Sequence, residues 1–200
     1  MSDYILPVCM YGSCYSYLSI YYYNPELARN IMAFINCIHS IILPYLYVYE
    51  NINTHENIVY WCIAYYIYDS VLSLINIYYT KQFKDFGYLL HHIVTMYLLY
   101  YANNVICMKA YFEFECTNLF LFLGLYLERN NNKNNLVFCK FAHIIMYAYL
   151  RLISGYHILL HFYKYMDYEM CIGALFLYIL CWAGMFGLII ETKDVIKKIM

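Results

Sequence analysis

Long uncharged stretches alternate with short polar segments along the 200 residues of the chain. The stretches that lack Asp, Glu, Lys and Arg, or contain only isolated ones, are residues 31–49, 58–79, 86–108, 110–127, 136–161 and 170–190. A run of about 18 or more such residues is long enough to cross the hydrocarbon core of a bilayer as a helix. The pattern therefore predicts an all-α protein, a polytopic transmembrane helix bundle with six spans.

Residues 4–23 form another uncharged stretch, although Pro7, Gly12 and three serines are unfavourable inside a helix. We expect them to form either a seventh span or a segment that lies in the membrane interface. A cleaved signal peptide is not expected, because a basic amino-terminal region and a clear cleavage site are both missing. The sequence thus predicts an amino-terminal segment over residues 1–25 and one transmembrane domain over residues 26–198.

Charged residues are few and unevenly placed, which gives a second indication of a membrane protein. Asp, Glu, Lys and Arg make up 12% of the chain, about half of the roughly 25% in an ordinary globular protein. If the span at residue 31 enters from the cytoplasm, nine basic residues lie on the cytoplasmic side and only Lys109 and Lys164 lie opposite. Cytoplasmic loops carry such an excess, so we expect a cytoplasmic carboxyl terminus. The nine are Arg29, Lys81, Lys84, Arg129, Lys133, Lys140, Lys193, Lys197 and Lys198.

The chain ends on Lys197-Lys198-Ile199-Met200, which resembles the dilysine signal that returns membrane proteins to the endoplasmic reticulum. Terminal lysines also serve as positively charged anchors on the cytoplasmic side of a membrane. We therefore expect a multi-pass integral membrane protein of the endoplasmic reticulum.

Ionisable residues inside the predicted spans are candidates for a functional site, because a charge in lipid is costly and usually faces a partner or a cavity. His39 lies about 12 Å from the cytoplasmic end of its helix and Asp69 about 13 Å. His91 and His92 lie about 10 Å from theirs, so three helices bring polar groups to one layer. Adjacent helical residues point about 100° apart, so the two histidines do not face the same atom. The layer indicates a cavity, with hydrogen bonds that merely join helices as the alternative.

A second group of ionisable residues lies toward the luminal side. Glu113 is about 12 Å from the luminal end of its helix, and Arg151 is roughly 15 Å from the end of its own. We expect Arg151 to pair with Glu113 or Glu115, or else to contact an anionic lipid head group.

Neither a metal site nor a disulfide framework is indicated. The nine cysteines show no C-x-x-C pair and no matched spacing. An intramembrane di-iron site would need many clustered histidines, whereas the chain has one H-x-x-x-H, at His157 and His161, beside the doublet. No metal or other cofactor is expected.

Five segments along the chain resemble, in order, the TLC-domain family of multi-pass membrane proteins, which includes the ceramide synthases. They read ARNIMAFINCIHS, YYIYDSVLSL, KDFGYLLHHIVTMYLLYYANN, FEFECTNLFLF and AYLRLI, and the likeness covers about residues 26–198. Its most specific part is K-D-F at residues 84–86 followed by H-H-I-V-T at residues 91–95, which is similar to the signature of the ceramide-synthase branch.

The resemblance implies that His91 and His92 are catalytic and that a sphingoid amine and a fatty acyl-CoA are the substrates. The next helix of the ceramide synthases carries a D-x-x-D pattern, where this chain has E-C-T-N at residues 115–118. The first acidic position of the pattern is therefore still an acid, Glu115, and the second is replaced by Asn118. In the wider family an acid is followed closely by Ser or Thr and then Pro, and Glu115 with Thr117 fits this apart from the missing proline.

The first functional hypothesis is a protein of membrane lipid metabolism or composition, with a lipid or acyl-chain cavity around the histidine pair. The alternative is an acyl-CoA-dependent N-acyltransferase of ceramide-synthase type, in which one of the two histidines takes the amine proton. Asp69 or Glu115 would orient that ring. Membrane lipids are the expected partners, nucleic acid is not expected, and a homo-oligomer stays open. Further residues expected to line the cavity or contact lipid are His39, Asn104, Glu113 and Arg151.

Overall fold

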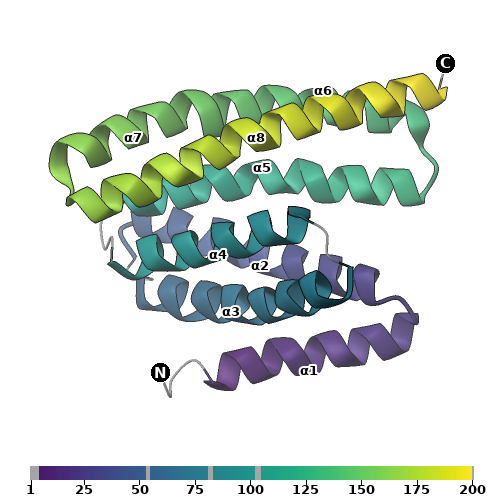
Figure 1. Ribbon diagram of the computed structural model, residues 1–200, viewed down its shortest axis with the longest axis horizontal. Helices are drawn as coiled ribbons and strands as arrows, with labels where there is room; N and C mark the ends of the chain where they lie inside the picture. Colours follow the sequence, from purple (N-terminus) through teal and green to yellow (C-terminus); the bar gives the residue numbers. More distant parts are fainter. Residues whose placement is uncertain (1–4, 53–54, 81–82, 102–104, 200) are drawn as a thin grey trace. The chain divides into compact units, whose positions relative to one another are not determined.

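The computed structural model describes residues 5–52, 55–80, 83–101 and 105–199, and almost all of them are helical (Figure 1). The helices are α1 (Ile5–Tyr22), α2 (Pro25–Tyr49), α3 (His55–Thr80), α4 (Phe83–Tyr101), α5 (Val105–Arg129), α6 (Lys133–Tyr147), η2 (Ala148–Ile153), α7 (Ser154–Tyr165) and α8 (Tyr168–Ile199). Because α6, the π-helix η2 and α7 follow one another without a break, these residues form seven continuous helical segments and no strand. The predicted all-α architecture of six to seven helices is confirmed.

Four helical segments of the described chain are long and apolar enough to cross a membrane. They are α2, α3 as far as Tyr79, the continuous segment α6–η2–α7, and α8 as far as Lys198. Helices α1, α4 and α5 are not among these four; α1 is rich in tyrosine and serine, and α5 carries Lys109, Glu113 and Glu115. The four segments are compatible with an integral membrane protein, as the sequence predicts.

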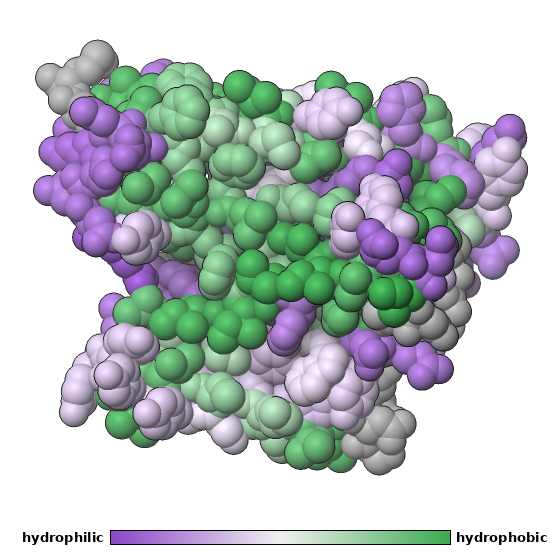
Figure 2. Space-filling model, turned by 180° about the vertical axis from the view of Figure 1, so that it is seen from behind, coloured by the Kyte–Doolittle hydropathy of each residue, from purple (hydrophilic) through white to green (hydrophobic). Residues whose placement is uncertain are grey.

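Helix α8 has the surface expected of a helix in lipid. Its exposed large apolar side chains recur every three or four residues along one face, at Ile172, Leu175, Ile179, Trp182, Phe186 and Ile190. They extend over about 27 Å of the helix axis, which is close to the roughly 30 Å of a bilayer's hydrocarbon core. Figure 2 shows the protein from behind the view of Figure 1, and apolar side chains predominate across the middle of that face too. We therefore expect this side of α8 to contact lipid chains.

Helix α2 begins at Pro25, six residues before the predicted span at residue 31. The side chain of Asn24 caps the helix by accepting a hydrogen bond of 2.9 Å from the backbone N–H of Leu27. Proline is favoured at the first helical position, where it removes no helical hydrogen bond. The span therefore includes Arg29, which the sequence pattern had placed at its border.

The predicted span 86–108 is not one helix, so this expectation was wrong. Helix α4 ends at Tyr101 and α5 begins at Val105, which assigns the last residues of the run to the next helix. No charge separates the two helices, because the run stays uncharged until Lys109. A helix boundary of this kind leaves no mark in a pattern of charged and uncharged positions.

Contacts divide the chain into two compact units, residues 1–109 and residues 110–200. In the first unit α3 packs against α1, α2 and α4, and α1 also packs against α2. The amino-terminal stretch is thus a full helix despite Pro7, which lies in its first turn, where proline breaks no helical hydrogen bond.

In the second unit α8 packs along the continuous segment that α6, η2 and α7 form. One face of α8 approaches Tyr147 closely at Gly184, where an added Cβ atom would overlap the phenol oxygen and lie 3.2 Å from Cζ. Glycine therefore permits the close packing of α8 at this position. The buried core around it contains Tyr147, Leu152, Cys181, Met185 and Leu188.

We expect Gly184→Ala to destabilise the second unit by about 1–3 kcal/mol, a usual cost of forcing a methyl group into a packed site. Tyr147 would have to move, although its ring also lies 5.0 Å from the guanidinium carbon of Arg151. Gly187→Ala is the matched control, because nothing lies within 4 Å of an added Cβ atom there. Thermal unfolding in detergent micelles measures both, and equal midpoints would contradict the close packing.

Candidate functional site

An ion pair joins α2 to α3 inside the first unit. Asp69 is only 5% exposed. Arg29 donates from Nε to Asp69 Oδ1 at 2.7 Å and from Nη2 to Oδ2 at 2.9 Å. The same Nη2 donates to Ser73 Oγ at 2.9 Å. Such a two-point contact between guanidinium and carboxylate is among the strongest polar interactions in proteins, and it fixes the orientation of the carboxylate.

Helix α4 brings His92 to the same carboxylate. His92 is 7% exposed, and its Nδ1 lies 3.6 Å from Asp69 Oδ2. This separation is longer than a hydrogen bond, so the contact is electrostatic. The ring of Tyr66 lies 5.0 Å from the imidazole, centroid to centroid. Tyr66, Asp69 and Ser73 share one face of α3, because helical residues three and four positions apart are neighbours.

Some polar atoms beside this ion pair have open hydrogen-bonding positions. Within the described residues, His92 Nδ1, Thr95 Oγ1 and Ser70 Oγ are buried and have no hydrogen-bond partner. Thr95 follows His92 by three positions and therefore lies on the same face of α4. Buried polar atoms are normally satisfied, so a group of open positions indicates where a polar ligand could bind. We call Arg29, Tyr66, Asp69, Ser73, His92 and Thr95 the Asp69 cluster.

The two histidines of the doublet occupy different environments. His92 is buried against Asp69, whereas His91 is half-buried, with its ring 5.7 Å from the ring of His92. The expected divergence of adjacent helical residues thus gives one histidine in the cluster and one beside it. Asn104 and the side chains of Lys84 and Asp85 lie outside the residues that the structure describes.

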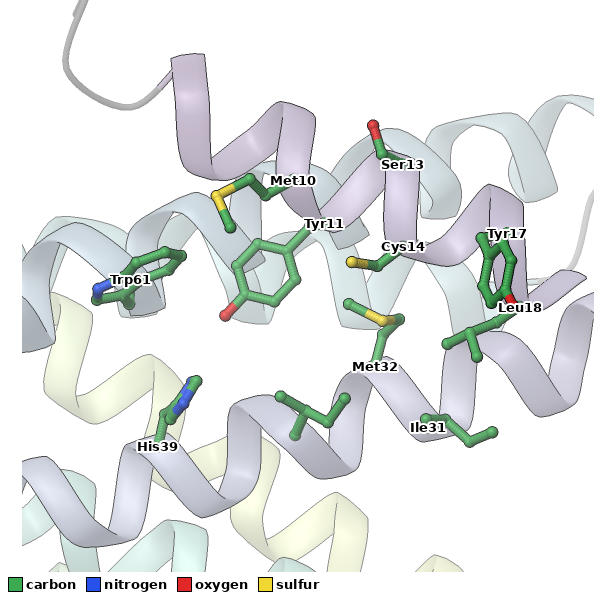
Figure 3. A pocket seen from close by; sticks show the side chains of 11 residues that line it. Met10, Tyr11, Ser13, Cys14, Tyr17, Leu18, Ile31, Met32, His39 and Trp61 are labelled. Carbon is green, nitrogen blue, oxygen red and sulfur yellow. The ribbon is translucent and has the colours of Figure 1, made fainter.

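His39 does not belong to the layer in which the sequence placed it. Its ring lies 6.4 Å from that of Trp61, on the wall of a separate apolar pocket (Figure 3). The neighbouring Ser40 contacts Cys62, with Oγ and Sγ 3.5 Å apart. Cys62 precedes Asp69 by seven residues, or about 10 Å along the axis of α3. Helix α2 therefore contributes Arg29 to the Asp69 cluster, and His39 lies at a different level.

Arg151 organises a second polar network, in the second unit. From the π-helix η2, its Nε donates to Thr117 Oγ1 at 2.7 Å, and its Nη2 donates to Phe114 O at 2.8 Å and to Asn118 Oδ1 at 2.9 Å. The guanidinium carbon also lies 5.7 Å from the ring centre of Phe114. Asn118 Nδ2 in turn donates to Glu115 Oε2 at 3.0 Å. Arg151 is therefore linked to Glu115 through an amide.

Glu113, the other predicted partner of Arg151, accepts a hydrogen bond from Ser154 Oγ. This bond joins α5 to the first residue of α7, which directly follows the π-helix. Glu113 and Arg151 thus bond between helices of the second unit, and Glu115 bonds to Asn118 on its own helix. π-helical turns often mark functional positions. In this π-helix, Nε and Nη2 of Arg151 donate to acceptors on helix α5, so the contacts of Arg151 are structural ones between helices.

Arg29 is the main residue of the cluster that the sequence pattern missed. It had been counted among the basic residues at helix ends. Asn24 followed by Pro25 is a recognisable helix start, and it places Arg29 one turn inside α2. This helix-start signal predicts that Arg29 lies inside the membrane span. A charge inside a span usually has a partner, so an acidic residue would be expected beside Arg29.

None of the known family models matches this chain. No curated protein and no solved structure shows significant similarity to it either. The function is therefore argued from the geometry of the chain's own residues.

Proposed function

We propose that this protein acts in membrane lipid metabolism or composition, and that the Asp69 cluster holds the polar head of a lipid. The observation that carries the proposal is the set of buried, open hydrogen-bonding positions at His92 Nδ1 and Thr95 Oγ1 beside the Arg29–Asp69 pair. Ionisable groups placed inside apolar helices are usually functional. Two of the three helices that form the cluster, α2 and α3, are long and apolar enough to cross a membrane.

The charges of the cluster favour an uncharged polar head. Arg29 and Asp69 neutralise one another at 2.7 Å, so no net charge is left to attract a phosphate or an ammonium group. An imidazole nitrogen and a threonine hydroxyl can each donate or accept. Hydroxyl or amide groups of a lipid therefore match the open positions best.

The resemblance to TLC-domain proteins supports the same proposal, since members of that family act on or among membrane lipids. The exposed Lys197 and Lys198 at the end of α8 are consistent with a retrieval signal in a cytoplasmic tail. We therefore propose the endoplasmic reticulum membrane as the site of this activity.

An N-acyltransferase is the second candidate, and the contact between His92 and Asp69 favours it. A base oriented by a carboxylate is a common catalytic arrangement, and such contacts are often long before the substrate binds. His92 would take the proton of an amine as its nitrogen attacks the thioester carbonyl of an acyl-CoA, and the coenzyme A thiolate would leave. Arg29 weakens this reading, because it already neutralises the carboxylate that would stabilise the charged imidazole.

We expect purified wild-type protein to retain more of a bound lipid than His92→Ala or Thr95→Val does. Each substitution removes a hydrogen-bonding position, which weakens binding by roughly fivefold for a bond worth about 1 kcal/mol. Ile93→Ala is the matched control, because Ile93 is 48% exposed on the same helix. Mass spectrometry of lipids extracted from equal amounts of each protein measures the difference.

The same preparations test the acyltransferase when they are supplied with labelled sphingoid base and acyl-CoA. A labelled amide formed by the wild type and by Ile93→Ala, but not by His92→Ala, would establish the catalytic reading. Identical lipid contents in all four proteins, with no labelled product, would remove both functions from the Asp69 cluster.

A further inference from the structure

A separate pocket of about 610 Å³ lies between α1, α2 and α3 of the first unit (Figure 3). Its walls are mainly apolar and include Met10, Leu18, Ile31, Met32 and Ile35. It shares no residue with the Asp69 cluster. Met10 and Ile35 are 47% and 40% exposed, so the pocket reaches the outer surface of the helices.

Tyr11 gives this pocket a polar feature. Its side chain projects from α1 toward α2, and its hydroxyl ends on the side of the pocket where Trp61 and His39 lie (Figure 3). The residue is 4% exposed, and its hydroxyl has no hydrogen-bond partner within the described chain. Neighbouring rings hold the phenol in place, with that of Tyr65 at 5.5 Å and that of Tyr68 stacked at 5.9 Å. A buried tyrosine hydroxyl usually finds a partner, so this one indicates a ligand with an oxygen atom.

The lining also limits the charge of that ligand. None of the eleven described residues around the pocket is a Lys, Arg, Asp or Glu. A phosphate or carboxylate head group would need a cation or several donors in such an apolar site. The ligand should therefore be neutral, with the Tyr11 hydroxyl as its polar contact.

The volume limits the size of the ligand. Pockets of roughly 300–1,000 Å³ enclose a single drug-sized molecule, and 610 Å³ lies within this range. We propose that the pocket binds a compact neutral lipid with one hydroxyl group, a lipid of the sterol class. Its hydrocarbon body lies between α1 and α2, and its hydroxyl bonds to the Tyr11 phenol. This site is independent of the function proposed for the Asp69 cluster.

A photoreactive sterol analogue, added to the full-length protein in mixed micelles, tests the proposal. We expect saturable labelling of the wild type that unlabelled sterol competes away. Tyr11→Phe should weaken it by roughly fivefold, the value of one hydrogen bond of about 1 kcal/mol. Tyr21→Phe, at an exposed position of α1 that does not line the pocket, should leave labelling unchanged.

Ile35→Trp is a second variant that does not depend on the hydroxyl. The indole would fill the pocket from α2, so saturable labelling should disappear while the protein still elutes as a single species. His92→Ala should label like the wild type, which separates this site from the Asp69 cluster.

Alkylation by N-ethylmaleimide gives an independent readout. Cys14 lines the pocket and Cys9 does not, and both are exposed free thiols on α1. Bound sterol should slow the modification of Cys14 and leave that of Cys9 unchanged, as measured by peptide mass spectrometry. Equal protection of both thiols, labelling that Tyr11→Phe and Ile35→Trp do not alter, or preferential labelling by a photoreactive fatty acid would each overturn the proposal.

Discussion

Asp69→Ala will destabilise the first unit by about 3 kcal/mol, the lower end of the range for breaking a buried ion pair. The substitution removes the carboxylate that accepts two hydrogen bonds from the Arg29 guanidinium, whereas the bond from Arg29 to Ser73 Oγ stays. The lower end applies because the Arg29 side chain is 24% exposed, so that part of its charge can still be solvated. His92 also loses the carboxylate that lies 3.6 Å from its Nδ1.

The double variant Arg29→Met/Asp69→Leu should recover most of the lost stability, because replacing both members of a buried pair by apolar residues is often neutral. Unfolding of the wild type, Arg29→Met, Asp69→Leu and the double variant in micelles completes the cycle that isolates the pair. Asp194→Ala is the control for a loss of one negative charge, since Asp194 is exposed on α8. Equal stability of Asp69→Ala and Asp194→Ala would contradict a structural ion pair.

Most of the helical architecture could be predicted, because the spacing of charges reflects the requirement to keep charge out of lipid. The boundaries at α2 and between α4 and α5 could not be predicted in this way. At α2 the predicted span began at residue 31, after the charge of Arg29, although Asn24 and Pro25 set the helix start at Pro25, six residues before residue 31. Between α4 and α5 the chain offers no charge at all.

The error at α2 explains why the predicted polar layer was only partly right. A shift of six residues displaces a position by about 9 Å along a helix. Counted from Pro25, His39 lies about 21 Å along α2 and not about 12 Å, as it does when counted from residue 31. The residue of α2 that contacts Asp69 is Arg29, about 6 Å along the helix. Asp69 and His92 were placed together correctly, because the ends of their helices were closer to those expected. The rotation of each helix about its axis, which turns His92 inward and His91 aside, is set by packing. It could not be predicted from the depth of a residue along its helix.

The count of basic residues was affected by the same assumption. Arg29 and Lys140 were assigned to loops or helix ends, yet each forms an ion pair within the helices. Lys140 is 4% exposed, and its Nζ lies 2.6 Å from Glu191 Oε1 on α8. A basic residue with such a partner carries little information on the side of the membrane, because the rule describes charges in loops. The prediction of a cytoplasmic carboxyl terminus therefore depends on the remaining lysines and on Arg129.

Arg151→Met is expected to destabilise the second unit by about 3 kcal/mol. Three hydrogen bonds to α5 are lost, and bonds between helices in a membrane are worth on the order of 1 kcal/mol each. Thr117 keeps its own bond of 2.7 Å to Phe114 O, but Asn118 Oδ1 loses its donor. Arg129→Met, at the exposed end of α5, is the matched control for the loss of one positive charge.

Arg151→Lys distinguishes the two roles that the sequence left open for this residue. Lysine keeps the charge but lacks the planar fork that reaches Thr117 and Asn118 together, so a helix-joining role predicts little recovery over Arg151→Met. Binding of an anionic head group would depend mainly on the charge, and lysine would then restore both stability and retained lipid. Unfolding midpoints together with lipid analysis of the two variants decide between these roles. Because Nε and Nη2 already reach three acceptors on α5, we expect the lysine variant to stay close to the methionine variant.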